Sequence, residues 1–373
     1  MQRKMEHLEA ARGLASIVVV FHHFFLAFLP LEKTELENTP LYFLVNGEAA
    51  VNFFFVLSGF VLLHRFFRAP TAEYLVIASL KRLPRLMVPA GASILCGYVV
   101  LAWNLSFHEQ AAHLTNSWWL ASFGNAHFPD RFAPHMSDAF LQILRVFITG
   151  DSFYYNSNLW TMRPEFVGSL ATLACATVVF APLTPFFRLS MLLIAAIVVR
   201  LTIPTLFPFI VGGALAYTMA NWTPPSLNGA FVSTALIVAI VFGFNSTYFD
   251  VQTGTSLLAI AGITASPQLS RRLSGKVGIW LGKISFPLYL VHTLIILSAA
   301  SLVYSLLAPY SVALALVSAM ITTWLSSLLA LWPFLKLEGW WVPLLGETMN
   351  KLKPTIGRCM KVLKPTSLPP VGR

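Results

Sequence analysis

Long apolar runs alternate with short polar connections over most of the chain. A transmembrane helix needs ~20 consecutive, mainly apolar residues to cross the hydrocarbon core of a bilayer. The runs that approach this length are 13–30, 47–64, 86–104, 160–180, 189–203, 205–220, 230–246, 253–269, 279–304 and 311–332. The pattern therefore predicts an all-α fold, a polytopic transmembrane helical bundle with about ten spans.

The runs 189–203 and 205–220 predict their spans less firmly than the others do. Both runs are short, and Pro204 and Pro208 interrupt this part of the chain. Proline removes a backbone donor and breaks the interior of a helix. The sequence alone therefore leaves an odd number of spans open in this region.

The stretch 105–159 is a long segment without a spanning run. It is rich in Asn, Ser, His and aromatic residues, and loops of this length usually carry function. The aromatic residues that favour a packed cap are Trp118, Trp119, Phe123, Phe128 and Phe132. We predict a membrane domain over residues 1–335, which includes this extracytoplasmic loop, and a basic cytoplasmic tail over residues 336–373.

The basic residues indicate which side of the membrane each connection faces. With a cytoplasmic N-terminus, 20 of the 25 Lys and Arg residues fall in cytoplasmic segments. Cytoplasmic loops carry the excess of these residues in membrane proteins, so we predict an N-in/C-in topology. The tail from Lys351 is basic and rich in proline, and we expect it to be flexible and to lie against anionic lipid.

Composition supports the membrane assignment and excludes other classes. The chain is 57% hydrophobic and 11% charged, whereas soluble domains carry roughly 25% charged residues. Its net charge of +10 is spread between apolar runs rather than gathered on a soluble face, so we predict no nucleic-acid partner. Cys96, Cys175 and Cys359 lie far apart in the sequence, and no disulfide framework or metal site is predicted from them.

The first apolar run carries two adjacent histidines, His22 and His23. At ~100° per residue, His23 shares a helical face with Arg12, whereas His22 is turned ~80° away. His23 lies ~16 Å along the helix from Arg12, near the middle of a ~30 Å core. An imidazole there could take a proton from a hydroxyl during group transfer. The alternative is a histidine that only hydrogen-bonds a neighbouring helix.

Glu165 follows Pro164 at the start of a predicted span. Proline suits the first turn of a helix, so Glu165 is expected to enter the bilayer from the outside. A carboxylate in that position must be paired or protonated. A histidine is a natural partner, and the neighbouring Arg163 is the alternative.

His292 lies about 13 residues into the span 279–304, which places it near mid-depth. Tyr289 and Ser285 share its helical face, and Pro287 is expected to kink the helix and free a carbonyl, which suits the wall of a cavity. An ionisable group inside a span is a functional candidate. A structural role for this histidine is an equally weighted alternative.

Lys81, Arg82 and Arg85 precede the third predicted span at its cytoplasmic end. Guanidinium groups match the geometry of phosphate, so these residues could hold a nucleotide-containing substrate. The alternative is an anchor that contacts lipid headgroups. The loop histidines, His108, His113, His127 and His135, show no metal-binding spacing and are interpreted as ordinary loop residues.

Five segments in order resemble the acyltransferase-3 family of integral membrane O-acyltransferases, which includes O-antigen and exopolysaccharide acetylases. The segments run from Leu8 through Arg12-Gly13 to His23, from Asn52 to Phe60, from Arg82 and Arg85 to Pro89, from Trp160 to Glu165 and from Ile284 to His292. They cover the chain from residue 8 to about residue 300. In two places the sequence departs from the family: Glu9 replaces the usual Asp, and Arg163-Pro164 replace small or apolar residues.

The resemblance implies transfer of an acyl group, acetyl in most members, from acyl-CoA (acetyl-CoA) to a hydroxyl of a carbohydrate or other envelope-associated small molecule. The expected catalytic residues are His23, Glu165 and His292, and the expected donor-binding residues are Arg12, Arg82 and Arg85. The donor would be used from the cytoplasmic side. We expect a multi-pass protein of the bacterial inner membrane, in contact with the lipid bilayer.

Two other functions compete with this interpretation. A transporter or flippase of an envelope precursor also contains buried His and Glu residues, but it would predict inverted repeats with broken helices, which the sequence does not show. A purely structural partner in an envelope-synthesis complex would tolerate changes at His23, Glu165 and Arg85.

Overall fold

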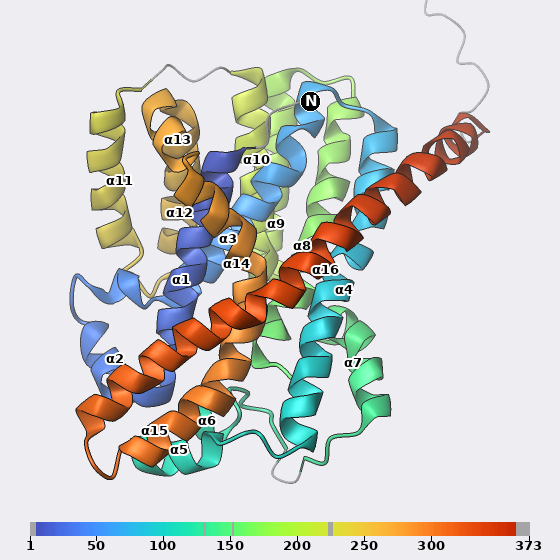
Figure 1. Cartoon of the computed structure of the whole chain (residues 1–373). Coiled ribbons are helices and arrows are strands. Elements are labelled where there is room, and N and C mark those ends of the chain that lie inside the picture. The colour runs from blue at the N-terminus through green and yellow to red at the C-terminus, as the bar shows by residue number, and fades with distance from the viewer. Residues whose placement is uncertain (1–4, 130–131, 151–152, 223–226, 363–373) are drawn as a thin grey trace, which may run out of the picture.

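The computed structural model describes residues 5–129, 132–150, 153–222 and 227–362, with side chains through Arg358. The described residues form helices and no strand (Figure 1). Each predicted span falls on a helix, which confirms the all-α fold. These helices are α1 (Glu6–Phe28), α3 (Gly47–His64), α4 (Ala72–Ala102), α8 (Met162–Cys175), α9 (Pro185–Thr202), α10 (Phe207–Asn221), α11 (Gly229–Gly243), α12 (Phe249–Ala265), α14 (Lys276–Ile295) and α16 (Val312–Val362).

Six helical stretches in the described part of the chain are long and apolar enough to cross a membrane. They are Glu6–Phe28, Gly47–Arg68, Ala72–Ala102, Pro185–Thr202, Lys276–Leu307 and Val312–Arg358. The other predicted spans correspond to α8, α10, α11 and α12, which have 14, 15, 15 and 17 residues. The protein is therefore a multi-pass membrane protein, while the count of about ten spans and the N-in/C-in topology stay predictions.

Short helices connect the long ones. They are α2 (Pro30–Leu36), α5 (His108–Thr115), α6 (Trp118–Ala121), α7 (Met136–Ile148), α13 (Pro267–Leu273) and α15 (Ser301–Leu307), with 3₁₀ turns η1 (Tyr42–Leu44), η2 (Phe66–Arg68), η3 (Ser157–Thr161), η4 (Ala176–Phe180) and η5 (Pro204–Leu206). A π-helical turn, η6 (Ile296–Ala300), joins α14 to α15. The chain therefore stays helical from Lys276 to Leu307.

Two helices differ from the prediction in extent. α4 begins at Ala72 rather than near residue 86 and continues through Pro84 and Pro89, so Arg82 and Arg85 lie inside a helix and not at its entry. α16 extends beyond the predicted span to Val362, so the described part of the predicted tail is helical rather than flexible. In Figure 1 α16 crosses the bundle diagonally, and it packs on both α14 and α4. Residues 363–373 of the predicted tail lie outside the described residues.

α1 and α14 pack closely because glycines remove side chains from their contact. A Cβ on Gly13 would lie 2.6 Å from Leu281, and one on Gly282 would lie 2.7 Å from Glu9. The two helices run parallel, because residues early in α1 contact the early part of α14 and later residues contact its later part. Two parallel spans need an odd number of crossings between them, and both the seven predicted spans and the three long apolar helices that lie between them in sequence meet this condition.

α3 and α10 form a second close contact through glycine. Gly59 lies against the backbone of Phe209, and Gly212 lies against the backbone of Val56. Any side chain at either position would clash with main-chain atoms, which cannot move aside as a flexible side chain can. This contact fixes α3 beside α10 and determines where Ser58, the neighbour of Gly59, points.

The described residues of the stretch 105–159 are folded and divide into two parts. α5 and α6 lie at the end of the bundle opposite the N-terminus, beside α15 (Figure 1). There Trp119 and Phe123 are buried in one cluster with Phe24 and Phe28 at the end of α1. α7 instead packs along α4 and α8. Trp118 is 59% exposed, so it contributes little to the packed cap that the sequence predicted.

A short segment, residues 153–161, precedes α8, ends in the 3₁₀ turn η3 and packs against α14. Its polar residues Asn156, Ser157 and Asn158 are all buried. Buried polar groups need hydrogen-bond partners. Here Asn156 Nδ2 donates to the carbonyl of Leu290 at 2.8 Å, which attaches this segment to α14 close to His292.

Candidate active site

The two intramembrane histidines contact each other between α1 and α14. His23 Nδ1 lies 3.0 Å from His292 Nε2 and 3.1 Å from the carbonyl oxygen of Val19. His292 is completely buried, whereas His23 is partly exposed. Of this pair, only the His23 side chain keeps exposed surface.

The partner of His292 Nδ1 determines how the pair shares its protons. This nitrogen lies 2.9 Å from the carbonyl oxygen of Leu288, and a carbonyl only accepts hydrogen bonds. In the neutral pair His292 therefore carries its proton on Nδ1 and accepts at Nε2 from the Nδ1–H of His23. This arrangement leaves the lone pair of neutral His23 on Nε2, the nitrogen available to a substrate.

His22 points to a different place than His23. In one tautomer, His22 Nδ1–H donates to the carbonyl oxygen of Val45 at 2.9 Å. In the other tautomer, Nδ1 accepts from the Gly47 amide at 3.2 Å. A Cβ on Gly47 would lie 2.5 Å from the His22 ring. His22 thus joins α1 to the turn before α3 and does not share the contact of His23 with His292.

Arg12 also faces α14, as helical phase predicted. Its Nε donates to Ser285 Oγ at 2.9 Å, and one Nη donates to the carbonyl of Gly282 at 3.2 Å. The same group pairs with Glu9 at 2.7 Å. The Arg12 side chain stays 33% exposed, so its guanidinium is held in position without being covered.

Glu165 lies in a separate polar cluster. Its carboxylate forms an ion pair with Arg82 and accepts from Ser58 Oγ at 2.8 Å, and Arg82 Nε donates to Ser169 Oγ at 2.7 Å. The expectation that Glu165 pairs with a histidine is wrong in this arrangement, and so is the alternative pairing with Arg163. The physical reason is that the first turn of α8 faces α4 and α3, where Arg82 lies inside α4 at the same level.

The three candidate arginines therefore have different surroundings. Arg82 is largely covered, with a side chain 14% exposed. Arg85, one turn further along α4, is exposed. α16 contacts α4 at this level, because Trp341 Nε1 donates to the carbonyl of Pro84 at 2.9 Å.

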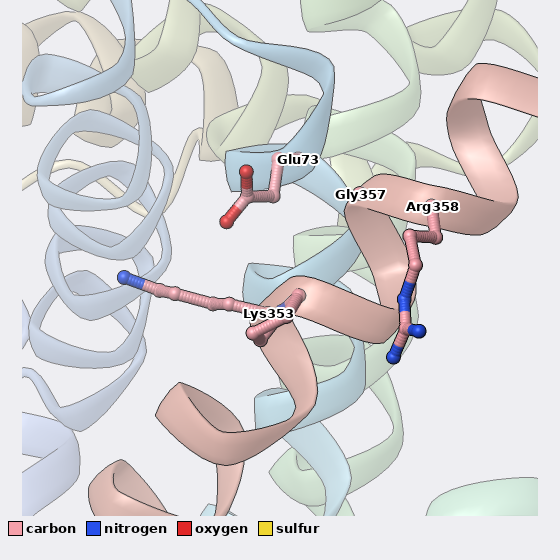
Figure 2. A pocket seen from close by; sticks show the side chains of 5 residues that line it. Glu73, Lys353, Gly357 and Arg358 are labelled. Atoms are coloured by element: carbon pink, nitrogen blue, oxygen red, sulfur yellow. The ribbon is translucent and has the colours of Figure 1, made fainter.

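A groove with a volume of about 360 Å³ lies further along the contact between α4 and α16. It is lined by Glu73, Lys353, Pro354, Gly357 and Arg358. In Figure 2 the Lys353 side chain extends below the Glu73 carboxylate, while Arg358 points away from both. The groove is basic but its cations do not converge on one point.

The segment 153–161 supports α14 around His292 through side chains that sequence reasoning did not single out. Asn158 Nδ2 donates to the carbonyl of Tyr289 at 2.6 Å and to Thr293 Oγ1 at 3.0 Å. Tyr289 O–H in turn lies 2.8 Å from Thr161 Oγ1. A run of small polar residues directly before a predicted span was the available signal. Its partners on α14 lie about 130 residues away in the chain and could not be read from it.

The described loop histidines show no shared site. His108 Nδ1 lies 2.6 Å from Ser106 Oγ, and burial lowers the pKa of His108 below its usual value. Ser106 Oγ and the Phe107 amide both donate to the carbonyl of Leu297 in the π-helical turn. Among the described residues, no group of three or more His, Cys, Asp or Glu side chains is arranged to hold a metal ion.

These features define a class, a multi-pass helical membrane protein in which a partly exposed histidine contacts a second, buried histidine. Comparison with known families gives a more specific result. The profile of the acyltransferase domain family, acyltransferase-3, matches residues 5–332 of the 373. The chain belongs to this family and is an acyltransferase. No curated protein and no solved structure matches it.

Proposed function

We propose that the protein transfers an acyl group, acetyl in the first instance, from acyl-CoA to a hydroxyl of a sugar or other envelope-associated acceptor. The observation that carries the proposal is the contact between His23 and His292, which leaves Nε2 of a partly exposed imidazole as a base. Membership of the acyltransferase-3 family supplies the class of reaction.

The chemistry follows from the free nitrogen of His23. Nε2 takes the proton of the acceptor hydroxyl as its oxygen attacks the thioester carbonyl. The carbon–sulfur bond breaks, and the departing thiolate of CoA takes up the proton. The alternative course, in which Nε2 first receives the acyl group and then passes it to the acceptor, uses the same atom. In both, the imidazolium formed at His23 donates through Nδ1 to His292, which acts as a positioning residue.

The donor is proposed to bind at the ends of α1 and α4 that we assign to the cytoplasm. CoA carries several phosphates, and guanidinium groups bind phosphate well. Arg12 and Arg85 keep exposed surface, while Arg82 already neutralises Glu165. We therefore assign phosphate contact first to Arg12 and Arg85, and we assign Arg82 and Glu165 the task of holding α4, α8 and α3 together. The N-in/C-in topology and the bacterial inner membrane are part of this proposal.

The central test replaces His23 and compares it with its neighbour. Purified protein in detergent would be supplied with radiolabelled acetyl-CoA and a panel of 4-nitrophenyl hexosides, and labelled product would be measured. His23→Ala should lower kcat at least about 100-fold, the usual contribution of a general base. His22→Gln, the matched control, keeps a hydrogen-bonding group towards Val45 and should retain most activity.

Two results would contradict the proposal. Transfer by folded His23→Ala at the wild-type rate would remove His23 from the reaction. Uptake of an envelope precursor by reconstituted protein, independent of CoA and without labelled product, would instead indicate a transporter or flippase.

A further inference from the structure

The groove between α4 and α16 lies at the end of the bundle that also holds the N-terminus (Figure 1). The two helices run in opposite directions there, because Trp341 contacts Pro84 while Lys353 lines the groove together with Glu73. One buried apolar cluster joins the helices beside the groove and consists of Ile77, Leu345 and Met349. Packing on this side therefore fixes the two helices that form the groove.

Two opposite charges line this groove without pairing. Glu73 is half-buried and Lys353 is exposed, and neither forms an ion pair with a described residue. Figure 2 shows the Lys353 side chain passing below the Glu73 carboxylate, with the two charged ends apart. Lys81 and Lys353 lie close enough for their charges to repel, and a negative group between them would remove that repulsion. The groove therefore offers places for one negative and one positive group.

An exposed apolar strip continues from the groove along α4. Val76 and Leu80 follow Glu73 at positions i+3 and i+7, so the three share one helical face, and both apolar side chains are exposed. Leu80 lies ~10 Å further along the helix than Glu73. Glu73 is in the first turn of α4, a helix long and apolar enough to cross a membrane. This face therefore changes from charged to apolar in the direction in which α4 enters the bilayer.

The part of α16 that forms the groove has the composition of a helix at the level of lipid headgroups. Trp340 is exposed, and the exposed cations Lys351, Lys353 and Arg358 follow it along the helix. Tryptophan is enriched at membrane–water interfaces, and clustered basic residues next to a membrane helix attract lipid headgroups. This part of α16 lies beyond residue 332, where the match to the family ends. The groove is therefore an addition to the acyltransferase domain and faces the headgroup layer.

We infer that this groove binds a phospholipid whose headgroup carries an ammonium group beside the phosphate, as an ethanolamine headgroup does. The phosphate lies between Lys353 and Lys81, the ammonium donates to Glu73, and the acyl chains follow Val76 and Leu80 into the membrane. The volume of about 360 Å³ is within the ~300–1,000 Å³ typical of ligand sites. An anionic headgroup, which the basic sequence of this region predicted, and the phosphates of CoA would both place negative charge beside Glu73 without a matching cation.

Gly357 allows a substitution that closes the groove. A Cβ on Gly357 would meet no atom within 4 Å, so Gly357→Leu should occupy the groove at little cost to the packing of the protein. Gly346 on the same helix is equally open and does not line the groove, which makes Gly346→Leu the matched control. Glu73→Gln and Lys353→Met each remove one charge and keep a side chain of similar length.

Native mass spectrometry of the full-length protein, titrated in detergent with phosphatidylethanolamine or phosphatidylglycerol of the same acyl chains, would measure the Kd of each lipid. Wild type should bind phosphatidylethanolamine more tightly. Glu73→Gln should weaken this lipid about tenfold, the loss of a hydrogen bond to a charged group, and should not weaken phosphatidylglycerol. Lys353→Met should weaken both lipids about tenfold. Gly357→Leu should weaken both at least as much, and Gly346→Leu should match wild type.

Three results would overturn the inference. An unchanged lipid preference in Glu73→Gln would leave Glu73 only its favourable place in the first turn of α4, at the positive end of the helix dipole. Tighter binding of phosphatidylglycerol by wild type would indicate a site for anionic lipid. Displacement of either lipid by CoA would assign the groove to the acyl donor. None of these measurements depends on acyl transfer, so the inference and the proposed function can fail separately.

Discussion

The contact between α1 and α14 and the contact of α8 with α3 and α4 both bury ionisable side chains, but they leave them in different states. In the first, one imidazole is sealed and the other keeps a free nitrogen on a partly exposed ring. In the second, the Glu165 carboxylate is paired with Arg82 and also accepts from Ser58. Both contacts contain motifs of the family resemblance, yet only the first presents an unused basic atom.

The difference teaches that polar residues inside a membrane bundle serve two separate purposes. A paired carboxylate and guanidinium lower the cost of each other's burial and fix how helices meet. An imidazole whose second nitrogen stays available can exchange a proton with a substrate. The sequence and the family resemblance led us to expect function in both regions, whereas we propose a catalytic role for the first and a structural role for the second, and variants can test this difference.

The largest effect is expected on stability, from breaking the ion pair of Arg82 and Glu165. Arg82→Met or Glu165→Gln alone leaves a mostly buried charge or its hydrogen-bond partners unmatched, which should cost about 3 kcal/mol of unfolding free energy. The double variant should recover more than half of that loss. Denaturant unfolding in detergent, followed by tryptophan fluorescence, would measure all three. Single variants as stable as wild type would show that the pair does not hold these helices.

A smaller effect, on kcat rather than on stability, is expected from changes at the contact between α1 and α14. His292→Leu removes the acceptor that stabilises the His23 imidazolium, and kcat should fall about 10- to 100-fold, the worth of one hydrogen bond to a charged group. His292→Gln offers an amide oxygen to His23 and should recover part of the rate. Both KM values should change little. Equal rates for the Leu and Gln variants would mean that the hydrogen bond to His23 is unimportant.

The smallest effect is expected on the KM for acetyl-CoA, from removing one of the contacts that hold Arg12. Ser285→Ala removes the acceptor of Arg12 Nε but leaves the Glu9 pair and the Gly282 carbonyl in place. The KM for acetyl-CoA should rise about three- to tenfold with kcat nearly unchanged. An altered acceptor KM with an unchanged donor KM would contradict the assignment of Arg12 to the donor.

The sequence predicted those features that depend on local periodicity. Apolar runs located the helices, and the ~100° turn per residue selected His23 over His22. It misjudged the extent of α4 and α16, because α4 begins well before Pro84 and α16 continues past Pro333, Pro343 and Pro354. Packing against neighbouring helices compensates for a proline in a membrane helix, and such packing leaves no local trace in the sequence.

Contacts between residues that lie far apart in the chain were the other feature that the sequence did not predict. The pairing of Glu165 with Arg82 joins residues 83 positions apart, and it depends on the level at which α8 begins beside α4. Similarly, Gly124 in the turn after α6 lies against Ser157 only because that turn packs on the segment 153–161. Helical phase determines which face a residue occupies, but it does not determine which helix lies opposite that face.

The attachment of residues 153–161 to α14 has a consequence for biosynthesis. Asn156 and Asn158 find their carbonyl partners at Leu290 and Tyr289, which are made more than 130 residues later. At ~5–20 residues per second, this delay is on the order of 7 to 27 seconds, during which the amides of this segment lack their final partners. The segment therefore acquires these partners only after the Tyr289–Leu290 part of α14 has been synthesised, and a chain that stalls earlier lacks them.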